Sequence, residues 1–110
     1  MAVPEIMLAA IRRFCRQATP PPLDREVVVE MTVRGNFVTI WERRPPPDNA
    51  SDEWTRMHAV QMRYNPADAT WSLYWRYRNR WEPYDARGVP LDLHKALTLV
   101  SEDRLGAFFG

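Results

Sequence analysis

Cysteine, glycine and long apolar runs are scarce in this chain of 110 residues. Cys15 is the only cysteine, so no disulfide can form within the chain, and a reducing cytoplasm is the expected compartment. Only four scattered glycines are present, which excludes a glycine-rich loop that binds phosphate groups. No apolar run approaches the roughly 18 residues that span a bilayer, and no basic segment precedes the first apolar residues. We therefore expect a soluble protein with no membrane partner.

Lysine is nearly absent as well, although basic residues are not. Of the fifteen basic residues only Lys95 is lysine, and the rest are arginine. Arginine forms bidentate hydrogen bonds to carboxylates and phosphates and stacks on aromatic rings. The net charge of +1 nevertheless predicts no strong long-range attraction of an anionic partner. A genome rich in G and C and a role in anion recognition both explain the excess of arginine.

The size and the hydrophobic content predict a single domain over residues 1–110. A hydrophobic fraction of 45%, including 12% aromatic residues, argues against disorder. A chain of this length can bury roughly two thirds of the surface of its unfolded state in one core. The ten prolines outnumber the glycines, which favours stiff connections. One such spacer is predicted over residues 44–53, where three successive prolines precede a polar loop.

The stretch from Trp71 to Asp85 has the pattern of a β-hairpin. Large apolar residues alternate with polar ones in its first strand, which is typical of an antiparallel sheet with one buried and one solvated face. The apolar side consists of Trp71, Leu73, Trp75 and Tyr77. The polar side consists of Ser72, Tyr74, Arg76 and Arg78.

The position of Trp81 depends on the length of the turn in this hairpin. A loop of two residues, Asn79 and Arg80, places Trp81 opposite Arg78 on the solvated face. A loop of three residues places it opposite Tyr77 in the core. Both alternatives are compatible with the sequence. Pro83 predicts that the following strand, over residues 81–85, lies at a sheet edge.

Residues 26–34 and 37–43 are predicted to form another hairpin, because both segments are rich in β-branched residues. Gly35 followed by Asn36 fits a type II′ turn. This turn places two pairs on the buried face, Val33 with Val38 and Met31 with Ile40. It places three pairs on the solvated face, Arg34 with Phe37, Thr32 with Thr39 and Glu30 with Trp41.

A third strand is predicted over residues 54–64. Its buried side is expected to hold His58, Val60, Met62 and Tyr64, and its solvated side Ala59, Gln61 and Arg63. In the register that aligns the buried faces, Tyr64 pairs with Trp71, Met62 with Leu73, and Val60 with Trp75.

Helices are predicted at both ends of the chain. From Pro4 to Ala18 a helical spacing connects Met7, Ala10, Ile11, Phe14 and Ala18. Asp92 is a suitable N-cap for a second helix that continues to about Ser101. Its apolar stripe comprises Leu93, Ala96, Leu97 and Val100. The terminal segment 105–110 is strongly apolar, so we expect at least one of Phe108 and Phe109 to be buried.

Together these elements predict an α+β fold: an N-terminal helix, an antiparallel β-meander of about five strands, and a C-terminal helix, with both helices on one face of the sheet. Several segments taken together resemble the bacterial domain-of-unknown-function family DUF3024. They are GNFVTIWERRPP, VQMRY, TWSLYWRYRNRWEPYD and the terminal GAFFG. The resemblance extends over nearly the whole chain and supports the fold. It implies no activity, cofactor or catalytic residue, because none is assigned to that family.

The residues that commonly carry catalysis form no convincing site. Cys15 on a helix and His58 on a strand could form a thiol and imidazole pair only if the tertiary fold brought them together. A lone cysteine near the apolar stripe of a helix is usually a small core residue. His58 and His94 have no neighbours at the spacing of metal ligands. We expect no metal, no cofactor and no catalytic residue, which favours a non-enzymatic protein.

The solvated face of the sheet is the better candidate for function. The candidate binding residues on it are Arg34, Phe37, Trp41, Arg43, Arg63, Tyr74, Arg76 and Arg78. Tryptophan, tyrosine and arginine are the usual anchors of protein interfaces, so a protein partner or a second copy of the chain could bind here. Rings and arginines on an open sheet also suit single-stranded nucleic acid. A third interpretation is that cross-strand pairs between cations and rings stabilise this face.

Overall fold

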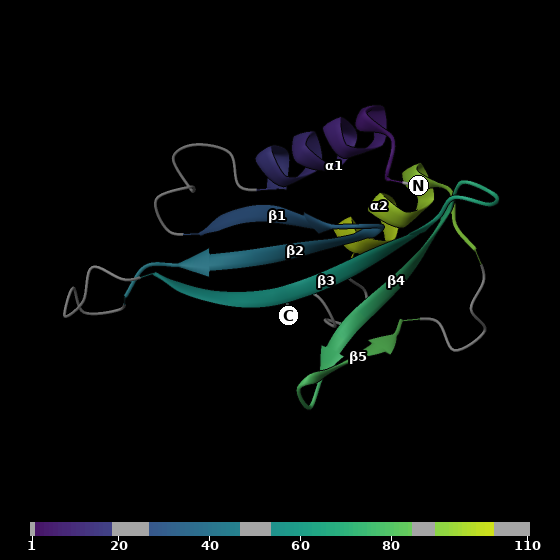
Figure 1. The fold of residues 1–110 in the computed structure, drawn as a ribbon. Coiled ribbons are helices and arrows are strands. Elements are labelled where there is room, and N and C mark those ends of the chain that lie inside the picture. The colour runs from purple at the N-terminus through teal and green to yellow at the C-terminus, as the bar shows by residue number, and fades with distance from the viewer. Residues whose placement is uncertain (1, 19–26, 47–53, 85–89, 103–110) are drawn as a thin grey trace.

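The computed structural model describes residues 2–18, 27–46, 54–84 and 90–102, and position 58 by its backbone alone. These residues form two helices and five strands (Figure 1). In chain order the elements are α1 (Glu5–Ala18), β1 (Val28–Arg34), β2 (Phe37–Arg44), β3 (Thr55–Asn65), β4 (Thr70–Tyr77), β5 (Arg80–Pro83) and α2 (Leu93–Glu102). Each strand pairs with the next in an antiparallel sheet of order β1-β2-β3-β4-β5. The predicted α+β meander between two helices is therefore confirmed.

The hairpin of β1 and β2 has the predicted register. Arg34 pairs with Phe37, Val33 with Val38, and the pairing continues without interruption to Val28 and Arg43. Gly35 has a φ of 59°, a left-handed value that glycine adopts without steric cost and that fits the first position of the predicted turn. Val38 and Ile40 are fully buried, which fixes their side of the sheet as the inner face.

A β-bulge in β3 was not predicted and changes the phase of this strand. Ile40 pairs with Val60, but the next residue, Trp41, pairs with position 58, so Ala59 is an extra residue. Ala59 was expected on the solvated face and is instead buried together with Val60. The backbone of position 58 pairs with Trp41, and the predicted face of the His58 side chain lies outside the description.

The hairpin of β3 and β4 confirms two of the three predicted pairs. Met62 pairs with Leu73, and Tyr64 pairs with Trp71. The ladder runs only from Asn65 and Thr70 to Gln61 and Tyr74, so the third expected pair, Val60 with Trp75, is not part of it. Below this point β4 leaves β3 and continues with β5 as a two-stranded ribbon (Figure 1).

The turn between β4 and β5 resolves the position of Trp81. Arg78 and Asn79 form the turn, with φ of 49° and 65°, the two left-handed values of a type I′ turn. Trp81 consequently pairs with Arg76 on the outer face. The turn lies one residue earlier than the predicted two-residue loop and is one residue shorter than the predicted three-residue loop. The face of Trp81 agrees with the two-residue alternative. Pro83 lies in the edge strand β5, as expected.

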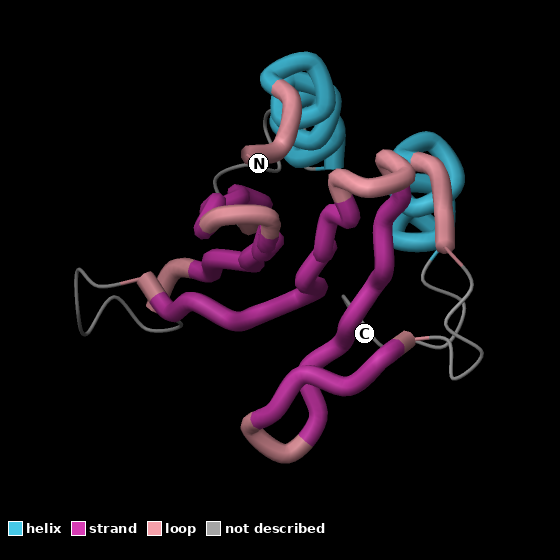
Figure 2. Tube along the Cα trace, turned by 45° about the vertical axis from the view of Figure 1, so that its right-hand side comes forward, coloured by secondary structure: helices cyan, strands magenta, loops and turns pink. Residues whose placement is uncertain are grey.

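Both helices lie on the same side of the sheet, as Figure 2 shows. From α1 the core receives Leu8, Ile11 and Cys15, with Met7 and Phe14 partly buried. The predicted apolar stripe of this helix is wrong at its last residue, because Ala18 is exposed. Helix α2 begins as predicted, since the backbone N–H of Lys95 donates to Oδ1 of Asp92 at 2.7 Å.

The core between the helices and the inner face is centred on Trp71, the largest side chain that is fully buried. Trp71 also pairs through its backbone with Leu91: its N–H donates to the carbonyl of Leu91 at 2.7 Å, and it accepts from Leu91 at 3.0 Å. Ala96 and Val100 of α2 are fully buried in the same cluster. The predicted spacer over 44–53, apart from its first residues, and the prediction for Phe108 and Phe109 lie outside the described residues.

Two methionines on β3 test this packing. Met62 is fully buried, whereas Met57 is 62% exposed. We expect Met62→Ala to lower the free energy of unfolding by about 2–5 kcal/mol because it leaves a cavity. Met57→Ala should change it by less than about 0.5 kcal/mol. Urea denaturation followed by tryptophan fluorescence measures both values, and equal losses would contradict the inner face as described.

Candidate binding surface on the outer face of the sheet

The outer face of the sheet, opposite the helices, carries seven of the eight candidate residues. Strand alternation and the observed registers put there Arg34, Phe37, Trp41, Arg43, Arg63, Tyr74 and Arg76. Arg78 lies in the turn between β4 and β5, with its guanidinium 5.2 Å from the ring centroid of Tyr77. The structure therefore brings the predicted surface together, except for this residue at its end.

Arg63 is the most closely held arginine of this face. Its guanidinium carbon lies 3.7 Å from the ring centroid of Tyr74 and 4.5 Å from that of Phe37. Its Nε donates to Oε1 of Gln61 at 2.8 Å, and Nε2 of Gln61 donates to Oγ1 of Thr39 at 3.3 Å. Gln61 is only 8% exposed, although it belongs to the outer face. Two rings and a buried amide thus hold the guanidinium in one orientation.

A second cluster surrounds Glu30 at the other end of β3. The guanidinium of Arg56 lies 3.7 Å from the ring centroid of Trp41, and its Nε lies 3.5 Å from a carboxylate oxygen of Glu30. The other oxygen of Glu30 lies 3.5 Å from Nη1 of Arg43. The guanidinium carbon of Arg43 lies 5.7 Å from the ring centroid of Trp54. Trp41 donates from Nε1 to Oγ1 of Thr32 at 2.8 Å. This cluster combines stacking with partial neutralisation of its arginines.

The bulge explains why sequence reasoning missed part of this cluster. With uninterrupted alternation, Arg56 would share the inner face of Val60, but the extra residue Ala59 returns it to the outer face. Trp54 precedes the strand and has the same phase as Arg56. Trp81 joins the face for a different reason, the position of the type I′ turn, and lies 5.4 Å from the guanidinium of Arg76. The adjacent apolar residues Ala59 and Val60 are the signal in the sequence from which a break in the alternation of β3 could have been inferred.

The charges of the outer face divide it into two parts. Among the described residues, five arginines minus one glutamate leave four net positive charges. The neutralised half comprises Glu30, Arg43, Arg56, Trp41 and Trp54. The acid-free half comprises Arg34, Arg63, Arg76, Phe37, Tyr74 and Trp81. Within the described ranges, no carboxylate lies at ion-pair distance from an arginine of the acid-free half.

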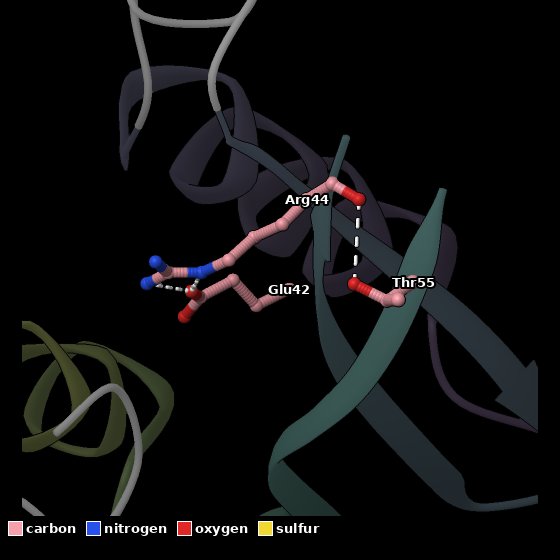
Figure 3. A network of polar contacts seen from close by, with 3 residues as sticks. All are labelled: Glu42, Arg44 and Thr55. Carbon is pink, nitrogen blue, oxygen red and sulfur yellow. Dashed lines mark hydrogen bonds and ion pairs between the residues drawn. The ribbon is translucent and has the colours of Figure 1, made fainter. Parts of the chain in front are cut away.

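Two other arginines of the sheet, Arg44 and Arg80, are each neutralised by a glutamate of the same strand. At the end of β2, Arg44 turns back onto the carboxylate of Glu42 on the same strand, as seen in Figure 3. The carbonyl of Arg44 also accepts from Oγ1 of Thr55 at 3.3 Å. In β5, Nε of Arg80 lies 2.6 Å from Glu82. These arginines have a carboxylate two residues away, and those of the acid-free half do not.

The remaining chemical groups give little support for catalysis. Cys15 is buried in the core, and this burial raises the pKa of its thiol to about 11 from 9.0, so the nucleophilic thiolate is disfavoured. The side chain of His58, its hypothetical partner, is outside the description. Within the described ranges no three or more His, Cys, Asp or Glu side chains gather as metal ligands would. Neither described helix has the length and apolarity of a bilayer-spanning segment.

The raised pKa of Cys15 predicts a nearly inert thiol. At pH 8 the thiolate fraction should be roughly a hundredfold lower in the folded chain than in the unfolded chain, because the pKa differs by about two units. A chromogenic disulfide reagent should therefore modify Cys15 at least that much more slowly in buffer than in denaturant. Comparable rates would indicate an accessible, activated thiol and would revive the enzymatic interpretation.

Comparison with known proteins places the chain in a family without extending its function. The search of curated proteins found no match, and neither did the search of solved structures. A family model, described as a domain of unknown function, matches residues 2–110, which include both helices and all five strands. The resemblance carried by the hairpin segments and the terminal segment is thereby confirmed. The chain belongs to the DUF3024 family.

Proposed function

We propose that this protein is a non-enzymatic binding module whose outer face binds an acidic segment of a partner protein. The observation that carries the proposal is the acid-free half of that face. Two of its arginines, Arg63 and Arg76, lie against aromatic rings, and none of its arginines has a carboxylate at ion-pair distance within the described chain. A guanidinium that is already ordered loses less entropy when it binds a carboxylate in the bidentate geometry that arginine favours.

The position of the arginines distinguishes this function from base stacking. Single-stranded nucleic acid binds to sheets through exposed ring faces, on which the bases stack. Here the guanidinium of Arg63 lies over Tyr74, and that of Arg56 lies over Trp41. A base would have to displace these cations or stack on them. The groups that remain available are the outer edges of the guanidinium groups, which suit carboxylates.

The sign of the charge also bears on self-association. Two copies that met through their outer faces would oppose two surfaces with four net positive charges each, which is unfavourable. Self-association through this face would need an acidic region of the second copy, and is therefore a special case of the same proposal. Nucleic acid stays the second candidate, because phosphates also accept from arginine and the same residues would bind them.

The proposal extends to two properties that follow from the sequence. The inner face and both helices contribute to one hydrophobic cluster, which supports a single domain over residues 1–110. The reducing cytoplasm expected from the single cysteine stays a prediction.

Fluorescence anisotropy with a labelled hexaglutamate peptide tests the proposed function. We expect salt-sensitive binding at low ionic strength, weakened about tenfold or more by the double change Arg34→Glu and Arg76→Glu. The matched control is Arg13→Glu with Arg16→Glu on the exposed side of α1, which changes the net charge equally and should alter the affinity less than about twofold.

A single-stranded oligothymidylate of equal charge provides the competing ligand. Tighter binding of the oligonucleotide than of the peptide, lost in the same outer-face variant, would favour nucleic acid as the partner. Equal loss of peptide binding in the outer-face variant and in the α1 variant would show that only net charge matters. That result would remove the outer face as the binding site.

A further inference from the structure

Each half of the outer face contains one arginine of β3 that lies over an aromatic ring. Arg63 and Arg56 belong to the same strand, β3, and to the same face. Each guanidinium carbon lies 3.7 Å from the centroid of an aromatic ring, Tyr74 in one case and Trp41 in the other. Their electrostatic surroundings differ: Arg56 lies 3.5 Å from Glu30, whereas Arg63 has no carboxylate partner among the described residues.

The hydrogen bonds of Arg63 fix which of its donors are free for a ligand. Its Nε is occupied by Oε1 of Gln61, and the amide of Gln61 is occupied in turn by Thr39. The guanidinium also contacts two rings, those of Phe37 and Tyr74. Within the described residues neither Nη group of Arg63 has a hydrogen bond or an ion pair, and two parallel N–H groups are the geometry that a carboxylate accepts in bidentate fashion.

The surroundings of Arg63 add positive charge and no competing acid. By register, Phe37 lies between Arg34 on β1 and Arg63 on β3, so the two arginines occupy one row across the sheet. The next position of the row is Ser72, which is exposed. The acid of the neighbouring turn, Asp68, accepts from both the N–H and the hydroxyl of Thr70, and so is used locally.

We propose that Arg63 anchors a carboxylate of the acidic partner segment and that Gln61 is the residue that positions it. This inference rests on the proposed function and adds a location to it. The acid-free half provides the main contacts to the acidic segment, while the neutralised half contributes by packing against the partner. Glu30 competes with the partner for Arg56 and Arg43, so those arginines gain less from a new carboxylate.

Charge-conserving substitutions separate Arg63 from Arg56. Lysine keeps the charge but lacks the planar fork and stacks less well, so Arg63→Lys should weaken binding of the labelled hexaglutamate peptide about tenfold. The matched variant Arg56→Lys should bind within about twofold of the unchanged protein, because Glu30 already occupies that cation. The net charge is identical in all three proteins, so general attraction cannot produce the difference.

The role of Gln61 needs a measurement that a purely structural role would not affect. Gln61→Met keeps a similar volume and removes the acceptor for Nε of Arg63, and should weaken peptide binding about fivefold. In nuclear magnetic resonance spectra of the peptide-free protein, the Nε–H signal of Arg63 should move in this variant, while that of Arg56 stays in place. Addition of the peptide to the unchanged protein should shift the signal of Arg63 and leave that of Arg56.

The outcomes distinguish this inference from the proposed function. If the unchanged protein does not bind the peptide, the proposed function itself fails. If it binds, but Arg63→Lys binds equally well or Arg56→Lys loses as much, the assignment of the anchor to Arg63 is overturned. Should Arg63→Lys not fold, the titration of the unchanged protein decides by the same criterion, because a shift at Arg56 without one at Arg63 contradicts the inference.

Discussion

Stacking of guanidinium groups on aromatic rings is the interaction on which the outer face of this sheet depends. Exposure of an aromatic ring to water is unfavourable, and an exposed arginine side chain has many rotamers that must be restricted before it can bind. When Arg63 lies over Tyr74, each covers the other, and the long side chain is ordered while the residue stays partly exposed. The face can therefore be rich in large rings, as few solvated sheets are, and still present charge to solvent.

The alternation of the strands made most of this fold accessible from the sequence. Trp71 and Leu73 were placed on the buried side by period two alone, and the order of Gly35 and Asn36 was sufficient to set the first register. These features are local: each depends on neighbouring residues and on turn chemistry. The same locality explains the success of the cap at Asp92.

The features that could not be predicted depend on tertiary structure. The bulge at Ala59 shifts the register of β3 against β2, and small residues of this kind also occur in regular strands. The turn at Arg78 and Asn79 requires two left-handed residues, and arginine is not a residue from which that conformation is inferred. Trp54 and Arg56 were missed because of the bulge, and the face of Trp81 was left open because of the turn. The sequence placed Glu30 on the solvated face, but it did not show that its carboxylate would pair with Arg43 and Arg56 and leave the other arginines without an acid.

Because β3 contains one extra residue, the length of this strand determines, as much as its composition does, which side chains lie on each face of the sheet. Side chains alternate with period two, so a homologous chain that is one residue shorter at Ala59 would direct the side chains from Trp54 to Met57 toward the opposite side of the sheet. An arginine at 56 would then lie on the inner face, and the outer face would lose a cation without any substitution. A gap in an alignment at this point, more than a change of residue type, would therefore mark a family member whose outer face carries a different set of side chains.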